Sequence, residues 1–295
     1  MNKNRATNLT KPNQLSQNDS RNAGSNFEAL PYYLMNIPNY LNQNKLRILQ
    51  QPDQALNKWS PIYNKHAADL LVQPLYQKFP SHVLNRKVVI QLFREGDFAL
   101  AATAAMMWEA ISEGKGHFAG FLSTGRERLA EITVHLKSLI EDGKSAEAFL
   151  FMQNEGKIKG VRYPYFTKLF FFIAASSGKK IDPVPLIFDK WTKNAYYALL
   201  TQSCSSEVTK YFSGTKKTTS DLQRNGVSAR SGRALVDSYI SYINDMTVWS
   251  KQLGVEPQKL EEFVFGTSRK IDQSATNPRN ELIAIILQSY EKPPV

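Results

Sequence analysis

The chain has 295 residues, with 37 lysines and arginines against 26 acidic residues and a formal net charge of +11. Hydrophobic residues make up 42% and aromatic residues 11%, which excludes a wholly disordered chain. The longest uninterrupted apolar run, residues 169–175, falls far short of the ~20 residues that a membrane helix needs. Cys204 is the single cysteine, so a disulfide framework, an iron–sulfur cluster and a Cys-based zinc site within one chain are excluded.

The same features predict a location and a class of partner. The N-terminus lacks the apolar stretch of a signal peptide, so we expect the protein in the cytoplasm, associated with the nucleoid. The four histidines have no metal-ligand spacing, and we expect neither a metal nor a cofactor. A basic protein of this kind is expected to bind nucleic acid and no membrane, and to be a monomer.

The positive charge is concentrated in one part of the chain. Residues 157–235 hold 14 basic and 4 acidic residues, a net charge of +10, while residues 1–156 have a net charge of +3 and residues 236–295 of −2. A solvated basic surface would explain such a cluster as well as a nucleic-acid site does, so the motifs inside it have to decide.

Helical spacing dominates the sequence after an N-terminal tail. Residues 1–26 are rich in Asn, Ser and Gln, have no aromatic residue, and predict a disordered tail before a helical domain over residues 27–295. Apolar residues three and four positions apart predict a mainly α fold. The predicted helices cover residues 97–113 (with one apolar face), 126–140, 146–153, 234–253, 257–265 and 281–289.

Two stretches are read differently. Residues 87–93 (KVVIQLF) suit a strand or a further helix equally well. Residues 205–233 are rich in Gly, Ser, Thr, Lys and Arg and poor in apolar residues, and they predict a mobile basic loop between helices.

Residues 146–200 contain the most specific pattern. A helix over 146–153 leads into a turn that contains Lys157, Lys159, Gly160, Val161 and Arg162, and Pro164 suits the first turn of the next helix. Helix, short glycine-containing turn and helix form a helix–hairpin–helix. Its backbone amides can bind a DNA phosphate, and the three basic side chains add positive charge.

The second helix of this motif is apolar on every side except at Lys168. Residues 165–175 read YFTKLFFFIAA, and a helix that is apolar all round is buried. Lys168 therefore either reaches a cleft, loses its charge and becomes a nucleophilic amine, or extends to the surface or to a carboxylate. After a loop with Pro183 and Pro185, Asp189 is placed as the N-cap of a helix over residues 190–200.

This arrangement resembles the helix–hairpin–helix DNA glycosylase superfamily, and most closely its 8-oxoguanine DNA glycosylase branch. Gly160 and Val161 match the start of the hairpin, Lys168 matches the catalytic lysine by its helix, and Asp189 matches the catalytic aspartate. Two departures stand out: Arg162 replaces the second glycine of the hairpin, and Pro164 occupies the place of the lysine in an ungapped comparison.

The resemblance implies a glycosylase that excises a modified purine such as 8-oxoguanine from double-stranded DNA, with AP-lyase activity, in base excision repair. Lys168 would attack the sugar, Asp189 would stabilise the developing charge, with Asp182 in reserve, and Phe172 and Trp108 would line the base pocket unless both are plain core. A non-catalytic nucleic-acid-binding protein of the same fold, possible in a bacterial antiphage defence system, is the alternative. A helical adaptor with an incidental basic loop is the third interpretation.

Overall fold

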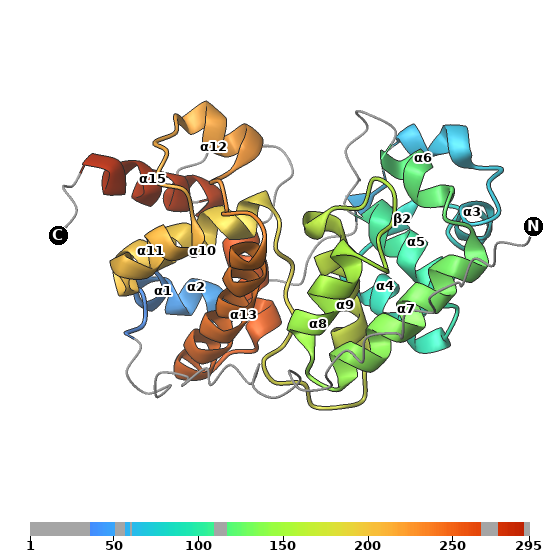
Figure 1. Ribbon diagram of the computed structural model, residues 1–295, viewed down its shortest axis with the longest axis horizontal. Helices are drawn as coiled ribbons and strands as arrows, with labels where there is room; N and C mark the ends of the chain where they lie inside the picture. Colours follow the sequence, from blue (N-terminus) through green and yellow to red (C-terminus); the bar gives the residue numbers. More distant parts are fainter. Residues whose placement is uncertain (1–35, 51–56, 60, 109–116, 267–276, 292–295) are drawn as a thin grey trace, which may run out of the picture. The chain divides into compact units, whose positions relative to one another are not determined.

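Helices form most of the regular structure in residues 36–50, 57–59, 61–108, 117–266 and 277–291, which are the residues that the computed structural model describes. All of them fall in one compact unit, Met35–Val295. The mainly α fold that the sequence predicts is confirmed (Figure 1). The expected tail, residues 1–26, lies outside the described residues.

The first elements are short. Two strands pair antiparallel, with Asn57 opposite Leu84 and Lys58 opposite Val83. The bounds are α1 Asn39–Gln43, α2 Lys45–Gln50, β1 Asn57–Lys58, a 3-10 helix Pro61–His66, α3 Gln73–Lys78 and β2 Val83–Leu84.

The next helices form a first group. The stretch that suited a strand or a helix is helical, because Asn85 caps the helix through its contact with the Val88 amide (2.8 Å) and Gly96, at φ +86°, ends it. In this group α4 packs on α5 and α9, and α7 packs on α5, α8 and α9 (Figure 1). The bounds are α4 Arg86–Glu95, α5 Phe98–Trp108, α6 His117–Leu122, α7 Arg126–Glu141, α8 Ser145–Gln153 and α9 Tyr163–Ser176.

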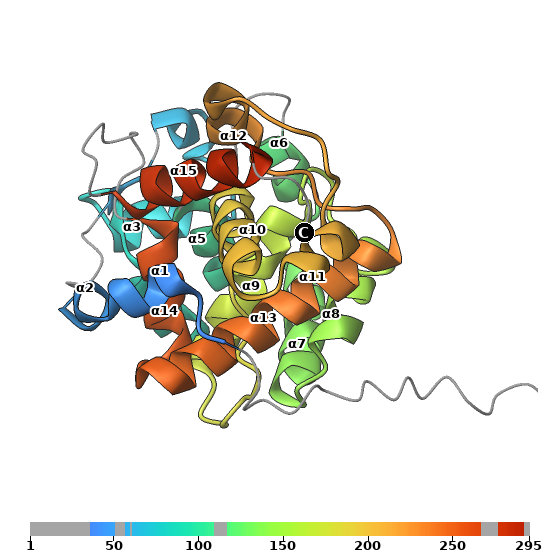
Figure 2. The same ribbon diagram turned by 90° about the vertical axis from the view of Figure 1, so that its left-hand side faces the viewer.

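A second group is assembled around α10. Figure 2 shows α15 lying across α10, and α14 and α11 also contact α10. The bounds are α10 Lys190–Ser203, α11 Ser205–Tyr211, α12 Thr219–Asn225, α13 Arg233–Leu253, α14 Pro257–Phe265 and α15 Pro278–Glu291. The predicted helices over 126–140, 146–153, 234–253, 257–265 and 281–289 are confirmed by α7, α8, α13, α14 and α15.

Two expectations need correction. The prediction of a loop over residues 205–233 is wrong, because α11 and α12 form within it; Thr218 and Asp221 make a reciprocal capping box that begins α12. The helix predicted over 97–113 is α5, but every residue from Ala99 to Trp108 is buried, so it has no single apolar face. Surrounding helices cover it on all sides, which the spacing of its own residues does not reveal. Residues 109–113 lie outside the described residues.

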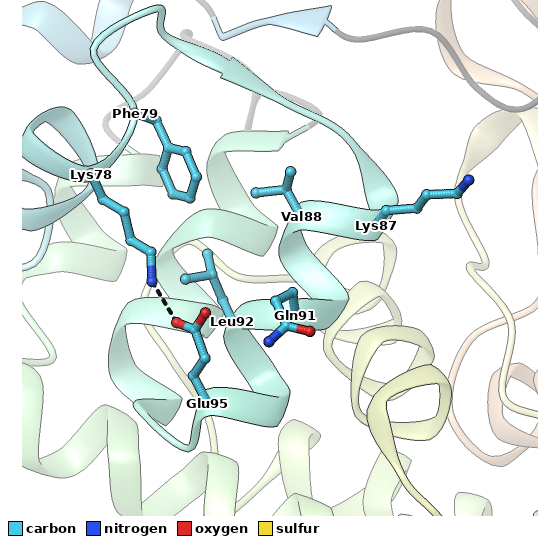
Figure 3. A pocket seen from close by; sticks show the side chains of 7 residues that line it. All are labelled: Lys78, Phe79, Lys87, Val88, Gln91, Leu92 and Glu95. Carbon is cyan, nitrogen blue, oxygen red and sulfur yellow. Dashed lines mark hydrogen bonds and ion pairs between the residues drawn. The ribbon is translucent and has the colours of Figure 1, made fainter.

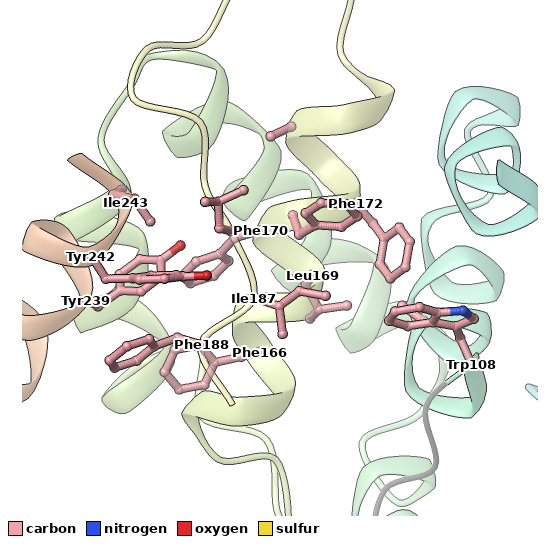
Figure 4. Packing of buried hydrophobic residues seen from close by; sticks show 14 of the residues in the cluster. Trp108, Phe166, Leu169, Phe170, Phe172, Ile187, Phe188, Tyr239, Tyr242 and Ile243 are labelled. Carbon is pink, nitrogen blue, oxygen red and sulfur yellow. The ribbon is translucent and has the colours of Figure 1, made fainter. Parts of the chain in front are cut away.

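An aromatic core joins the two groups of helices. Phe188, fully buried, contacts Tyr239 and Tyr242 of α13 at ring-centre distances of 5.8 and 5.1 Å. Figure 4 shows Ile187 and Phe188 among aromatic side chains of α9 and α13. Phe149 of α8 meets Tyr239 at 5.1 Å. The segment just before Asp189 is thus held by packing from both groups.

Candidate functional site

The hairpin between α8 and α9 has a buried side and a charged side. Ile158 and Val161 are buried, and the Val161 amide donates to the Ile158 carbonyl at 3.1 Å, which closes the turn. Lys157, Lys159 and Arg162 are exposed. The apolar pair therefore anchors the turn and leaves its three cations facing solvent.

Two glycines let the hairpin rest directly on α6. Gly160 has φ +82°, and a Cβ there would lie 2.5 Å from the carbonyl oxygen of His117. On the other side of the contact, a Cβ at Gly120 would lie 2.8 Å from the carbonyl oxygen of Lys159. Any side chain at either position would force the two backbones apart. The sequence analysis gave Gly160 a role in the turn but gave Gly120 none; a glycine inside a short apolar helix was the available signal.

Helix α9 is buried, as its apolar sequence predicts, and Lys168 is buried with it. Lys168 is 3% exposed, and its Nζ lies 5.7 Å from the ring centre of Trp108 and 5.7 Å from that of Tyr165. Tyr165 is three residues earlier on the helix and only half-buried, so it is the more accessible of the two rings. Pro164 lies in the first turn of α9, as expected.

Asp189 is the N-cap of α10, and a hydrogen bond ties its segment to α9. Its Oδ1 accepts from the amides of Trp191 (2.7 Å) and Thr192 (3.1 Å), and the Thr192 hydroxyl accepts from the Asp189 amide. One residue earlier, the Phe188 amide donates to the Oγ1 of Thr167 at 3.1 Å. Because Thr167 precedes Lys168 and Phe188 precedes Asp189, this bond places the two predicted catalytic residues on adjacent segments.

A buried ion pair near this site was missed by the sequence analysis. Arg86 of α4 pairs with Glu261 of α14 at 2.8 Å, and the two side chains are 9% and 0% exposed. The Arg86 guanidinium lies over the rings of Phe171 (4.7 Å) and Trp108 (5.3 Å). Arg86 and Lys168 thus both approach the ring of Trp108. We call Arg86, Lys168 and Glu261, with Asp189 at the edge, the charged core cluster.

The electrostatics of Glu261 connect it with Asp189. Burial holds the pKa of Glu261 above its usual range; Arg86 opposes this, and the negative charge of Asp189 adds to it. The same two carboxylates contribute to the raised pKa of Tyr242, after burial, its largest cause. The signal in the sequence was an acid on an apolar helical stripe, since Glu261 lies one turn after Pro257 and one turn before Val264, both buried.

The other predicted site residues, Phe172, Trp108 and Asp182, do not line an open pocket in this structure. Phe172 is fully buried and packs edge-on against Trp108 at 5.3 Å, and Trp108 is 1% exposed. Both belong to the core in this structure, and Trp108 also contacts Lys168. Asp182, the reserve carboxylate, is exposed and pairs with Lys251 at 2.7 Å.

A pocket lies elsewhere, between α3 and α4. Figure 3 shows the ion pair of Lys78 and Glu95 among its lining side chains, and none of the predicted site residues lines it. In the part of the chain that the structure describes, no group of three or more His, Cys, Asp or Glu side chains could hold a metal ion. Among the residues that the structure describes, no helix is both long and apolar enough to cross a bilayer.

A helical protein with a helix–hairpin–helix, a buried lysine on its second helix and an aspartate capping the next helix has the architecture of the DNA glycosylase fold. The sequence matches the family model described as "Putative 8-oxoguanine DNA glycosylase OGG-like protein" over residues 49–265, well over half of the chain. The protein therefore belongs to this family. No curated protein and no solved structure shows significant similarity to the chain.

Proposed function

We propose that the protein is a DNA glycosylase that removes a modified purine, such as 8-oxoguanine, from duplex DNA. The observation that carries this proposal is the hydrogen bond between Phe188 and Thr167, which brings the segments of Lys168 and Asp189 together within the matched region. The name of the family gives DNA as the partner and 8-oxoguanine as the type of base.

Each residue has a defined task in the proposed reaction. The Lys168 amine attacks C1′ of the flipped nucleotide, and the bond from C1′ to the base breaks. The base leaves with the bonding electrons and takes up one proton from the amine. The C1′–O4′ bond then breaks, O4′ takes up the second amine proton, and a Schiff base links Lys168 to C1′. Loss of a C2′ proton then expels the 3′ phosphate, which is the lyase step.

Asp189 supplies negative charge as the sugar becomes positive. The helix cap holds this carboxylate in place, because its Oδ1 accepts from the amides of Trp191 and Thr192. Among the described residues Oδ2 has no hydrogen-bond partner, so it is the oxygen that faces the developing charge. Because Lys168 is 3% exposed, DNA binding must also move side chains such as Tyr165 aside.

The exposed side of the hairpin suits the DNA backbone. Lys157, Lys159 and Arg162 project from a turn whose Ile158 and Val161 are held in the core. Phosphate contacts of this kind fix the position of a protein on DNA without reading sequence. We therefore place the DNA strand that carries the flipped base along this turn.

Borohydride trapping tests the chemistry directly. The wild-type protein should form a covalent adduct with 8-oxoguanine duplex, and Lys168→Gln should abolish it while duplex binding is kept. Lys144→Gln is the control, because Lys144 is an exposed lysine before α8 that pairs with Asp142, outside the site, and its variant should keep the adduct. Asp189→Asn should slow the reaction by about 10²–10³-fold. An adduct that forms equally well in Lys168→Gln contradicts the assignment.

The burial of Lys168 also favours a second candidate, a DNA-binding protein of the same fold without catalysis, with a role in antiphage defence. In that case no adduct forms on a panel of modified bases, while duplex binding remains and falls steeply with salt. Trapping with any base in the panel excludes this candidate.

A further inference from the structure

Residues 212–230 form a folded element, which we call the α12 module. Phe212 and Ala229 make an antiparallel bridge, and the Ser213 amide donates to the Ser228 carbonyl at 2.9 Å. Between these ends, α12 begins at its capping box with Thr218. The two ends of the segment are therefore joined by backbone contacts, and α12 lies between them.

Two lysines of α10, Lys190 and Lys193, attach this module to the start of α10, and a third, Lys217, bonds within the module. The Nζ of Lys190 donates to the Gln223 carbonyl (2.9 Å), that of Lys193 to the Val227 carbonyl (3.3 Å) and that of Lys217 to the Gly226 carbonyl (2.6 Å). Asn194 adds two bonds, to the Leu222 carbonyl (3.1 Å) and from the Val227 amide (2.8 Å). These contacts fix the module against the helix that Asp189 caps.

The attachment brings positive charges close together. Burial lowers the pKa of Lys217, and the ammonium of Lys193 lowers it further. Residues 212–230 contain four basic residues and one acid, and that acid, Asp221, accepts from Thr218 in the helix cap. The module therefore carries an excess of positive charge that nearby carboxylates do not balance.

The cations of the module divide into two classes. Lys217 donates to the Gly226 carbonyl inside the module, and Lys190 and Lys193 of α10 are the anchors that donate to its carbonyls from outside. Lys216 and Arg224 are exposed, and no carboxylate of a described residue forms an ion pair with either. The anchors hold the module in place, while the exposed pair is available to a ligand.

Lys193 also connects the module with the hairpin. Besides the Val227 carbonyl, its ammonium donates to the hydroxyl of Tyr163 (2.8 Å), the first residue of α9 after the hairpin turn. The module and the hairpin thus lie on either side of one buried lysine. Figure 2 shows α12 beside α15.

We propose that the α12 module is a second contact with the phosphate backbone of duplex DNA, made through Lys216 and Arg224. The proposal rests on the proposed function and adds to it a second backbone contact, separate from the hairpin. Because phosphate contacts carry no sequence information, the module strengthens binding to damaged and undamaged duplex alike.

Fluorescence anisotropy over a range of salt concentrations tests this on the full-length protein. The slope of log K against log[salt] is negative, and each phosphate contact removed makes it less steep by about 0.9. The double variant Lys216→Ala/Arg224→Ala should make that slope less steep by up to ~2. It should also weaken binding to undamaged duplex and to 8-oxoguanine duplex by the same factor. The matched control is Lys45→Ala/Lys144→Ala, which removes two exposed cations at the starts of α2 and α8.

The outcomes separate this inference from the function on which it rests. If the double variant binds like wild type, or weakens no more than the control, the module is not a DNA contact, although the glycosylase proposal stands. If the wild-type protein binds no duplex at all, both proposals are wrong. A loss confined to damaged duplex also contradicts the inference, because it would indicate base recognition.

Discussion

The charged core cluster and the basic face formed by the hairpin and the α12 module use charge in opposite ways. Arg86, Lys168 and Glu261 are buried, Arg86 and Lys168 beside the ring of Trp108, and Arg86 and Glu261 make a short ion pair. Lys157, Lys159, Lys216 and Arg224 are exposed. A buried charge depends on its neighbours, so its loss affects folding or chemistry. An exposed cation depends on solvent and ligand, so its loss affects affinity.

The largest effect is expected for Arg86→Ala. Removing the guanidinium leaves Glu261 buried without its ion-pair partner, and we expect a loss of about 3–5 kcal/mol in the free energy of unfolding. Chemical denaturation measures this. Arg94→Ala, on the exposed side of the same helix, is the control and should stay within about 0.5 kcal/mol of wild type. Equal effects of the two substitutions would show that the buried ion pair contributes no more to stability than an exposed arginine does.

The buried acid Asp245 should make the stability of the folded protein depend on pH. Burial raises the pKa of Asp245 to about 7, although the Tyr196 hydroxyl, at 2.7 Å, opposes the shift. Between an unfolded value near 3.8 and the folded value, the folded state binds the extra proton, so stability falls as pH rises from about 4 to about 7. The maximum slope for one proton is about 1.4 kcal/mol per pH unit.

Asp245→Asn keeps an oxygen that can accept from Tyr196 and removes the titration. We therefore expect thermal stability to depend less on pH between 4 and 7. From pH 4 to pH 7, the variant should lose less stability than the wild-type protein loses over the same range. Asp237→Asn, a half-buried acid on the same helix that pairs with Arg233, is the control. An unchanged profile in Asp245→Asn would contradict the assignment.

Gly160→Ala tests whether the hairpin is rigid although its cations are exposed. Gly160 and Gly143 both have positive φ, +82° and +73°, but only at Gly160 would a Cβ meet backbone, that of His117. Both substitutions strain φ, and Gly160→Ala should lose about 1–3 kcal/mol more than Gly143→Ala. Thermal unfolding measures the difference, and equal losses would show that the contact with α6 is not close.

The smallest effect on stability is expected for Lys157→Ala/Lys159→Ala. These exposed side chains should change the free energy of unfolding by no more than about 0.5 kcal/mol. In a salt titration of duplex binding, however, the plot of log K against log[salt] should become less steep by up to ~2. A large loss of stability with unchanged binding would remove the distinction between the core cluster and the basic face.

Local pattern predicts much of the fold and part of the site. The spacing of apolar residues predicts α7, α8, α13, α14 and α15, and the apolar sequence on every side of α9 predicts that this helix is buried. The N-cap role of Asp189 also follows from its place before a helix. The loop expected over 205–233 is wrong because two short helices there depend on capping and on attachment to α10 rather than on an apolar stripe.

The charge of +10 within residues 157–235, the helical periodicity and the hairpin motif are determined by the sequence itself, since each depends on residues close together in the chain. Tertiary structure alone decides which charges are buried and which remain exposed. It pairs Arg86 with Glu261, sets Gly120 against the hairpin, and turns three lysines toward carbonyls while it leaves Lys216 and Arg224 outside. The physical reason is that these contacts join residues that are distant in sequence, and no local pattern specifies such partners.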